Sequence, residues 1–157
     1  MIADGPAWIW RVAGECYPEA EGELDFHHAS EHLWTPARDP FKDEESAHDW
    51  VGSLLKGVKR RGGSELLPIL EGLLEMAEDE WPEEERQVLS RETAYFQKHS
   101  SHLYYPKAKR QGFPLGSGVM ESACSQLQGR FKRPGQFWGE SGEDNLLASE
   151  LARRNGD

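Results

Sequence analysis

The sequence predicts an α/β fold that is mostly helical, and three observations lead to this prediction. A strand–turn–helix–strand pattern opens the chain, and helical periodicity of apolar residues runs through most of the remaining sequence. The composition, 37% hydrophobic and 29% charged over 157 residues, is typical of a globular chain with a packed core rather than a disordered one.

The opening pattern consists of short elements. The apolar Met1-Ile2-Ala3 is interpreted as the C-terminal end of a strand, and Asp4-Gly5-Pro6 has the composition of a turn. Apolar residues then recur at helical spacing over residues 7–17, and Glu23-Leu24-Asp25-Phe26 is typical of a short strand. Strand, helix and strand in this order favour an α/β arrangement.

From residue 28 onward the pattern is helical. Gly62-Gly63 separates two helices, and residues 104–116, with Pro106 and Pro114, are predicted to form a loop. The predicted helices cover residues 28–34, 42–59, 64–79, 82–99, 119–132 and 140–154. The chain therefore divides into part of a sheet-based core (1–37), a helical insertion (38–99), and a last part with two helices and a basic segment (100–157).

Composition restricts the environment of the chain. No apolar run approaches the roughly 18 residues of a membrane-spanning helix, and the first residues lack the basic start and apolar stretch of a secretory signal. We therefore expect a cytoplasmic protein without a membrane partner. Cys16 and Cys124 are too few for a disulfide framework, and we expect both to be small buried hydrophobes.

Positive charge is concentrated in one segment. The formal net charge is −10, yet residues 107–133 hold six basic residues against one acid, Glu121. The basic residues are Lys107, Lys109, Arg110, Arg130, Lys132 and Arg133. This concentration predicts contact with a nucleic-acid phosphate backbone, and the alternative is a solvated surface patch.

Two carboxylates stand at positions suited to metal binding. Asp4 follows the first strand, and carboxylates at strand ends point into the crevice outside a sheet. Glu121 follows the glycine-rich turn Gly116-Ser117-Gly118 and lies in the first turn of its predicted helix. Each also has a simpler explanation, because Asp4 belongs to a turn and Glu121 complements a helix dipole.

A histidine-rich stretch is a third candidate. His28 and His32 are four residues apart on one helical face, and His28-Ala29-Ser30-Glu31-His32 matches the H-x-x-E-H pattern of inverted zincins. A zinc-dependent hydrolase would need a further ligand, which the sequence does not single out. Alternatively, the histidines hydrogen-bond within the core, or line a cleft together with Asp25 without holding metal.

Taken together, these segments resemble the C-terminal catalytic part of bacterial insertion-sequence transposases of the ISKra type. These are DDE enzymes with a ribonuclease-H-like core, related to Mutator-like transposases. The most specific match is the Gly-Ser-Gly-x-x-Glu-Ser-Ala-Cys block at 116–124, followed by Asp4-Gly5-Pro6-Ala7-Trp8-Ile9-Trp10. The other matching segments are 24–33, Tyr95-Phe96, and Arg130-Phe131-Lys132 with Gly135 and Trp138.

The resemblance implies a partial ribonuclease-H-like core interrupted by an all-helical insertion. Asp4 and Glu121 match the second and third acids of the catalytic triad and would bind Mg²⁺ or Mn²⁺. Asp25 and His28 fall where related enzymes carry a Cys-x-x-His pair. Arg130, Lys132 and Trp138 would lie along the DNA-facing side.

The implied activity is DNA transposition by metal-dependent phosphodiester cleavage and strand transfer. Its partners would be the transposon ends and the target DNA, with a homo-oligomer formed by the full-length protein. The first acid of the triad would precede residue 1, so the resemblance implies a truncated fragment that is inactive alone. A non-catalytic remnant that binds nucleic acid through residues 107–133 is the remaining alternative.

Overall fold

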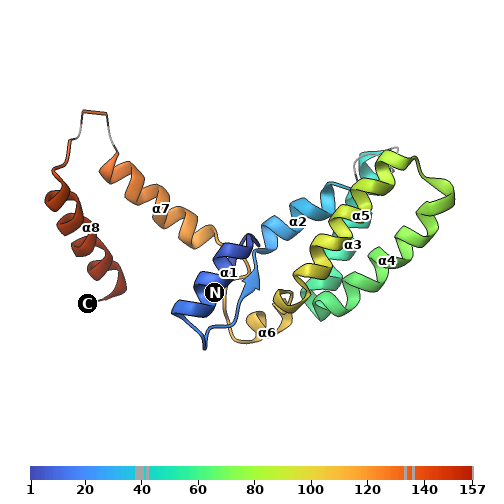
Figure 1. The fold of residues 1–157 in the computed structure, drawn as a ribbon, viewed down its shortest axis with the longest axis horizontal. Helices are drawn as coiled ribbons and strands as arrows, with labels where there is room; N and C mark the ends of the chain where they lie inside the picture. Colours follow the sequence, from blue (N-terminus) through green and yellow to red (C-terminus); the bar gives the residue numbers. More distant parts are fainter. Residues whose placement is uncertain (38–40, 42, 133, 136, 157) are drawn as a thin grey trace. The chain divides into compact units, whose positions relative to one another are not determined.

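The computed structural model describes residues 1–37, 41, 43–132, 134, 135 and 137–156. Within these residues the chain forms eight α-helices, one 3₁₀ helix and two short strands, which confirms the α/β, mostly helical class (Figure 1). In chain order the elements are β1 (Ile2–Ala3), α1 (Ala7–Cys16), β2 (Glu23–Leu24), α2 (Phe26–Trp34), α3 (Glu44–Arg61), α4 (Gly63–Glu80), α5 (Glu83–Lys98), η1 (Ser100–His102), α6 (Tyr105–Arg110), α7 (Gly118–Phe131) and α8 (Glu140–Asn155).

The chain packs as two compact units, Met1–Ser117 and Gly118–Asp157. The first unit contains both strands and the helices α1 to α6, and the second contains α7 and α8. Residues 100–117 therefore pack with the segments before them, and Glu121 belongs to the other unit.

In the first unit, β1 and β2 form a two-stranded parallel sheet. Ile2 pairs with Glu23 and Ala3 with Leu24, and α1 makes the connection between the strands. A parallel pair requires such a crossover, because the chain must return to the same end of the sheet before the second strand begins. Leu24 is fully buried and joins the sheet to the helical core.

The helices α3, α4 and α5 lie side by side and form most of the core of the first unit (Figure 1). The side chain of Asp43 caps α3 by accepting a hydrogen bond from the Ser46 N–H at 2.7 Å. Acidic residues in the first turn of α3 and basic residues in its last turn complement the helix dipole. Buried apolar residues from these helices, α2 and β2 meet in the core: Leu24, Leu33, Val51, Leu54, Val58, Leu66, Leu70, Leu89 and Phe96.

Gly62 ends α3 and allows α4 to begin immediately. Its φ angle is 71°, in the left-handed region that favours glycine. A Cβ at this position would lie 2.3 Å from the Leu103 carbonyl oxygen. The predicted break at Gly62-Gly63 thus has both a backbone and a steric cause.

Residues 105–110 correct the prediction of a loop over 104–116, because they form α6. Pro106 had suggested a break, but it occupies the first turn of α6, where a missing N–H is tolerated. Burial of Tyr105 in the core, together with burial of Ala108, stabilises this short helix.

Both cysteines are exposed, so the prediction that they are buried was wrong. Cys16 ends α1, a helix without buried residues, and on α7, which carries Cys124, burial is confined to Phe131 among the described residues. Helical periodicity identified an apolar stripe on α7 but not whether another element covers it.

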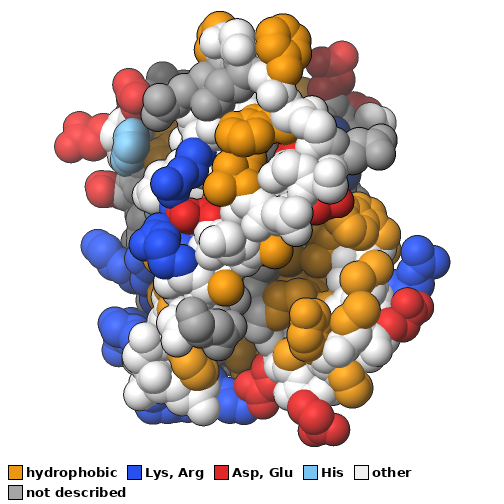
Figure 2. Space-filling view, turned by 90° about the vertical axis from the view of Figure 1, so that its left-hand side faces the viewer, with side chains coloured by type: hydrophobic (Ala, Val, Ile, Leu, Met, Phe, Trp, Pro, Cys, Tyr) orange, Lys and Arg blue, Asp and Glu red, His pale blue; other side chains and the backbone are white. Residues whose placement is uncertain are grey.

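Hydrophobic side chains of the second unit reach the surface. Val119 and Met120 of α7 are 75% and 65% exposed, and Leu147 and Leu151 of α8 are also exposed. Figure 2 shows such hydrophobic side chains at the surface near Lys and Arg side chains. Across the described part of the chain, no helix combines the length and the apolar character that a bilayer crossing requires.

Candidate functional site: the strand-end acids and the histidine cluster

Asp4 and Asp25 lie at the same edge of the parallel sheet, because each directly follows a strand. The Asp25 N–H donates to the Ala3 carbonyl at 2.9 Å, which extends the strand pairing as far as the two acids. Asp4 is exposed, whereas only 2% of the Asp25 surface is. In α/β sheets this carboxyl-terminal edge is where ligands bind.

The turn after β1 is held against α5. Gly5 has a φ angle of 99°, and a Cβ there would lie 2.8 Å from the Tyr95 hydroxyl oxygen. The Tyr95 hydroxyl donates to the Asp4 carbonyl at 3.2 Å, and the Trp10 Nε1–H donates to the Gly5 carbonyl at 3.1 Å. These contacts fix the main chain that carries the Asp4 carboxylate.

Four histidines contact Tyr95 or Trp10, the side chains that hold this turn, although the sequence had singled out only two of them. Tyr95 stacks on His32 with ring centroids 3.7 Å apart, and it contacts His99 at 4.6 Å. Trp10 stacks on His102 at 4.0 Å. We call this group the histidine cluster: Trp10, His28, His32, Tyr95, His99 and His102.

Two members of the histidine cluster, His99 and Tyr95, have shifted pKa values. Burial lowers the pKa of His99, and the positive charges of Lys98 and of the neighbouring histidines lower it further. Burial, together with the carboxylates of Asp4 and Glu92, raises the pKa of Tyr95. Near pH 7, therefore, His99 is neutral and the Tyr95 hydroxyl keeps the proton that it donates to Asp4.

His32, the second histidine of the H-x-x-E-H stretch, is paired with an acid outside that stretch. Its Nδ1 lies 2.6 Å from an oxygen of Glu92, which is only 4% exposed, and Arg91 contacts the other oxygen of Glu92. His28 Nδ1 lies 3.4 Å from Glu31. Among the residues that the structure describes, no three His, Cys, Asp or Glu side chains form a group that could hold a metal ion.

Asp25 joins the start of α2 to the segment that precedes α7. One of its oxygens accepts hydrogen bonds from the N–H groups of His27 and His28, at 2.8 and 2.9 Å. The other accepts from the Ser117 N–H. Burial by itself raises the pKa of Asp25, but these backbone donors, together with a hydrogen bond from the Ser117 side chain, outweigh that effect and hold the pKa below its usual value.

The same contact explains the glycine at position 116. The Phe26 N–H donates to the Leu115 carbonyl at 2.9 Å, which brings residues 115–117 against the start of α2. A Cβ on Gly116 would lie 2.8 Å from the His27 ring. Asp25, predicted to line a cleft, thus uses its oxygens to hold the Gly116-Ser117 segment.

Glu121 lies in the first turn of α7, as predicted, and its side chain is exposed. It belongs to the Gly118–Asp157 unit, whereas Asp4 belongs to the Met1–Ser117 unit. The contacts of Asp4 are therefore described within the first unit, and those of Glu121 within the second.

The predicted DNA-binding residues are divided between the two units. Lys107, Lys109 and Arg110 are exposed on α6, where Lys107 pairs with Glu21. In the second unit Lys132 is exposed, Arg130 pairs with Glu150 at 2.8 Å, and the Trp138 Nε1–H donates to the Phe131 carbonyl at 2.9 Å. Arg133 lies outside the described residues.

Comparisons with protein-family models, with curated proteins and with solved structures found no match to this chain.

Proposed function

We propose that this chain is the C-terminal catalytic part of a DDE transposase and acts on DNA phosphodiester bonds through Asp4 and Glu121. The observation that carries the proposal is the place of Asp4. This exposed carboxylate directly follows β1, the first strand of a parallel β–α–β unit, at the edge where α/β sheets bind ligands. The motif resemblance at residues 4–10 and 116–124 supports the same assignment.

In this proposal, the elements from β1 to α2 belong to a partial ribonuclease-H-like core, and α3 to α5 form the helical insertion that separates the second acid from the third. The partners are transposon ends and target DNA, bound by a homo-oligomer of the full-length protein in the cytoplasm. The exposed basic residues of α6 and those near the end of α7 contact the DNA backbone.

The donor chemistry of the two acids suits Mg²⁺ or Mn²⁺. Both side chains are exposed carboxylates, and Mg²⁺ takes hard oxygen ligands from few protein groups, completing its shell with water and substrate phosphate. When bound, such ions activate the attacking water or 3′-hydroxyl and stabilise the leaving oxygen. No covalent nucleophile of the protein is then needed.

The residues around Asp4 position it for this role. Tyr95 and Trp10 hydrogen-bond main-chain carbonyls of the Asp4-Gly5 turn, which leaves the Asp4 carboxylate outside these bonds. On the other strand, Asp25 binds Ser117 at the start of the segment that leads to Glu121. Fixing the main chain near a reacting group lowers the entropic cost of reaching the productive geometry.

Paramagnetic Mn²⁺ provides the test, because it broadens NMR signals of nearby amides. We expect Mn²⁺ to broaden the signals around residue 4 and around residue 121 at the same concentrations. Asp4→Asn and Glu121→Gln should each weaken both effects by about tenfold or more. The matched control is Asp49→Asn, which removes an exposed carboxylate from α3.

The proposal fails if the two effects are independent. Broadening around Glu121 that persists unchanged in Asp4→Asn would show that the acids bind separate ions. The same variants are then compared for Mn²⁺-dependent nicking of supercoiled plasmid.

A further inference from the structure

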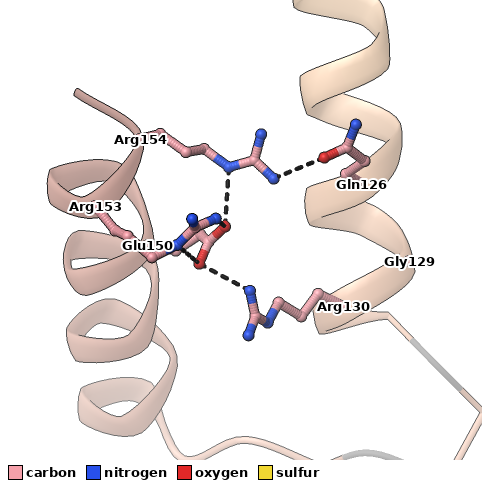
Figure 3. A pocket seen from close by; sticks show the side chains of 6 residues that line it. All are labelled: Gln126, Gly129, Arg130, Glu150, Arg153 and Arg154. Carbon is pink, nitrogen blue, oxygen red and sulfur yellow. Dashed lines mark hydrogen bonds and ion pairs between the residues drawn. The ribbon is translucent and has the colours of Figure 1, made fainter. Parts of the chain in front are cut away.

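Three arginines in the second unit surround one buried acid, as Figure 3 shows. Glu150 of α8 is 6% exposed. Arg153 and Arg154 follow it on the same helix, and Arg130 reaches it from α7. The sequence had identified Arg130 alone, although acids and bases three and four residues apart on α8 are a known pattern of helical ion pairs.

The hydrogen bonds in this group are short and well defined. Glu150 accepts from Arg130 Nη1 at 2.8 Å, from Arg153 Nη2 at 2.7 Å and Nε at 3.1 Å, and from Arg154 Nε at 2.9 Å. Arg154 also donates to the Gln126 side chain on α7 at 3.0 Å. The carboxylate thus orients all three guanidinium groups.

The group has an excess of two positive charges. Hydrogen bonds from Arg153 are the first cause that lowers the pKa of Glu150, to about 2, so this acid stays ionised near neutral pH. Arginine keeps its proton throughout this range. Three cations against one anion remain in place from mildly acidic to alkaline conditions.

A purely structural role does not account for this excess. One arginine on α7 would be enough to join the two helices through Glu150, and among the described residues the ion pairs of Arg153 and Arg154 are both with Glu150. Arg130 and Arg153 are 57% and 67% exposed, and the group borders an open pocket of about 540 Å³. Each guanidinium has five N–H donors, so the bonds to Glu150 and Gln126 use only some of them.

We propose that Arg130, Arg153 and Arg154 form a phosphate-binding site, with Glu150 as its positioning residue. Planar guanidinium groups match phosphate oxygens in bidentate geometry, and two excess charges suit a phosphate group. The site requires only a phosphate group. Its assignment to the DNA backbone rests on the proposed function. This assignment extends the proposed DNA-contacting surface from α7 to the end of α8.

The test is binding of the full chain to a fluorescently labelled DNA duplex, measured by anisotropy in EDTA at several NaCl concentrations. The double variant Arg153→Gln/Arg154→Gln should bind about tenfold more weakly or worse, with the salt slope reduced by about 2. The matched control is Arg60→Gln/Arg61→Gln, because these arginines are also adjacent and exposed in the last turn of a helix. The control should change affinity far less.

A second measurement on the unmodified chain does not depend on the folding of a variant. Titration with inorganic phosphate should shift the Nε–H signals of the three arginines more than those of Arg60 and Arg61. Weakened DNA binding in the α8 variant assigns the site to backbone phosphate, whereas phosphate shifts with unchanged DNA affinity assign it to a free phosphate. If neither occurs, the proposal is overturned.

The metal proposal and the phosphate site can fail separately. Mn²⁺ broadening tests the metal proposal, whereas DNA affinity in EDTA, where no divalent ion is bound, tests the phosphate site. An unmodified chain that binds DNA in EDTA but shows no shared Mn²⁺ broadening around residues 4 and 121 would contradict the nuclease assignment and leave the phosphate site supported.

Discussion

Asp25 in the first unit and Glu150 in the second are both buried acids, with 2% and 6% of their surfaces exposed, and the pKa of each is lowered. Asp25 accepts hydrogen bonds mostly from main-chain N–H groups, those of residues 27, 28 and 117, and one from the Ser117 side chain. Glu150 accepts from arginine side chains that are partly exposed. Main-chain donors cannot turn away without local unfolding, whereas guanidinium groups can reach a ligand, so the first acid maintains the fold and the second prepares a binding site.

The largest expected loss of stability comes from replacing Asp25. Asp25→Ala loses the cap of α2 and leaves the Ser117 N–H without its acceptor, so we expect the free energy of unfolding to fall by about 2–4 kcal/mol. Asp43→Ala is the matched control, because Asp43 caps α3 from an exposed position, and it should cost only about 1 kcal/mol. Urea unfolding followed by circular dichroism measures both. Equal losses would contradict the special role of Asp25.

Acid titration separates the two kinds of donor. The folded pKa lies below the usual value of 3.8 for Asp25 and of 4.5 for Glu150, where it is about 2. Each ionised acid therefore stabilises the fold fully above its usual pKa, and this stability is lost as the pH falls through the folded pKa. Side-chain carboxyl signals followed by NMR in low and high salt report each pKa. Salt should raise the pKa of Glu150, because its cations are screened, and barely change that of Asp25. Equal shifts of the two pKa values with salt would contradict the distinction between arginine donors at Glu150 and main-chain donors at Asp25.

The smallest change in the free energy of unfolding is expected for a substitution at the turn after β1. Tyr95→Phe removes one hydrogen bond to the Asp4 carbonyl, and because Asp4 is exposed, water can replace the donor. The cost should be about 0.5 kcal/mol, at the low end for such a bond. Thermal unfolding measures it. A loss as large as that of Asp25→Ala would mean that side chains, rather than main-chain donors, hold this edge of the sheet.

Much of the helical framework could be predicted from local signals. Apolar periodicity and the Gly62-Gly63 break placed α3, α4 and α5 close to their observed positions. Pro106 misled the prediction for α6, because a proline in the first turn is compatible with a helix when buried contacts stabilise it. The exposed Cys16 and Cys124 show that an apolar residue on a helical face says little about whether that face is covered.

The candidate sites were predicted only in part. His28 and His32 are four residues apart, and their ring contact follows from helical spacing. His99 and His102 were not predicted, because Trp10, which contacts both rings, comes from a distant segment. His102, for instance, hydrogen-bonds the Gly22 carbonyl across 80 residues of sequence. The pattern of Glu150 with Arg153 and Arg154 was visible locally, whereas the approach of Arg130 from α7 was not.

The sequence by itself determined the positions of the long helices α3, α4 and α5, because capping, dipole and periodicity act over a few residues. It extended the second strand to Phe26, whereas β2 ends at Leu24, Asp25 caps α2 and Phe26 begins that helix. Tertiary packing decided which side chains meet: Ser117 reaches Asp25 across 92 residues, and Tyr95 reaches Asp4 across 91. Such contacts depend on how buried faces fit together, and that fit is a property of the whole packed unit rather than of any local stretch.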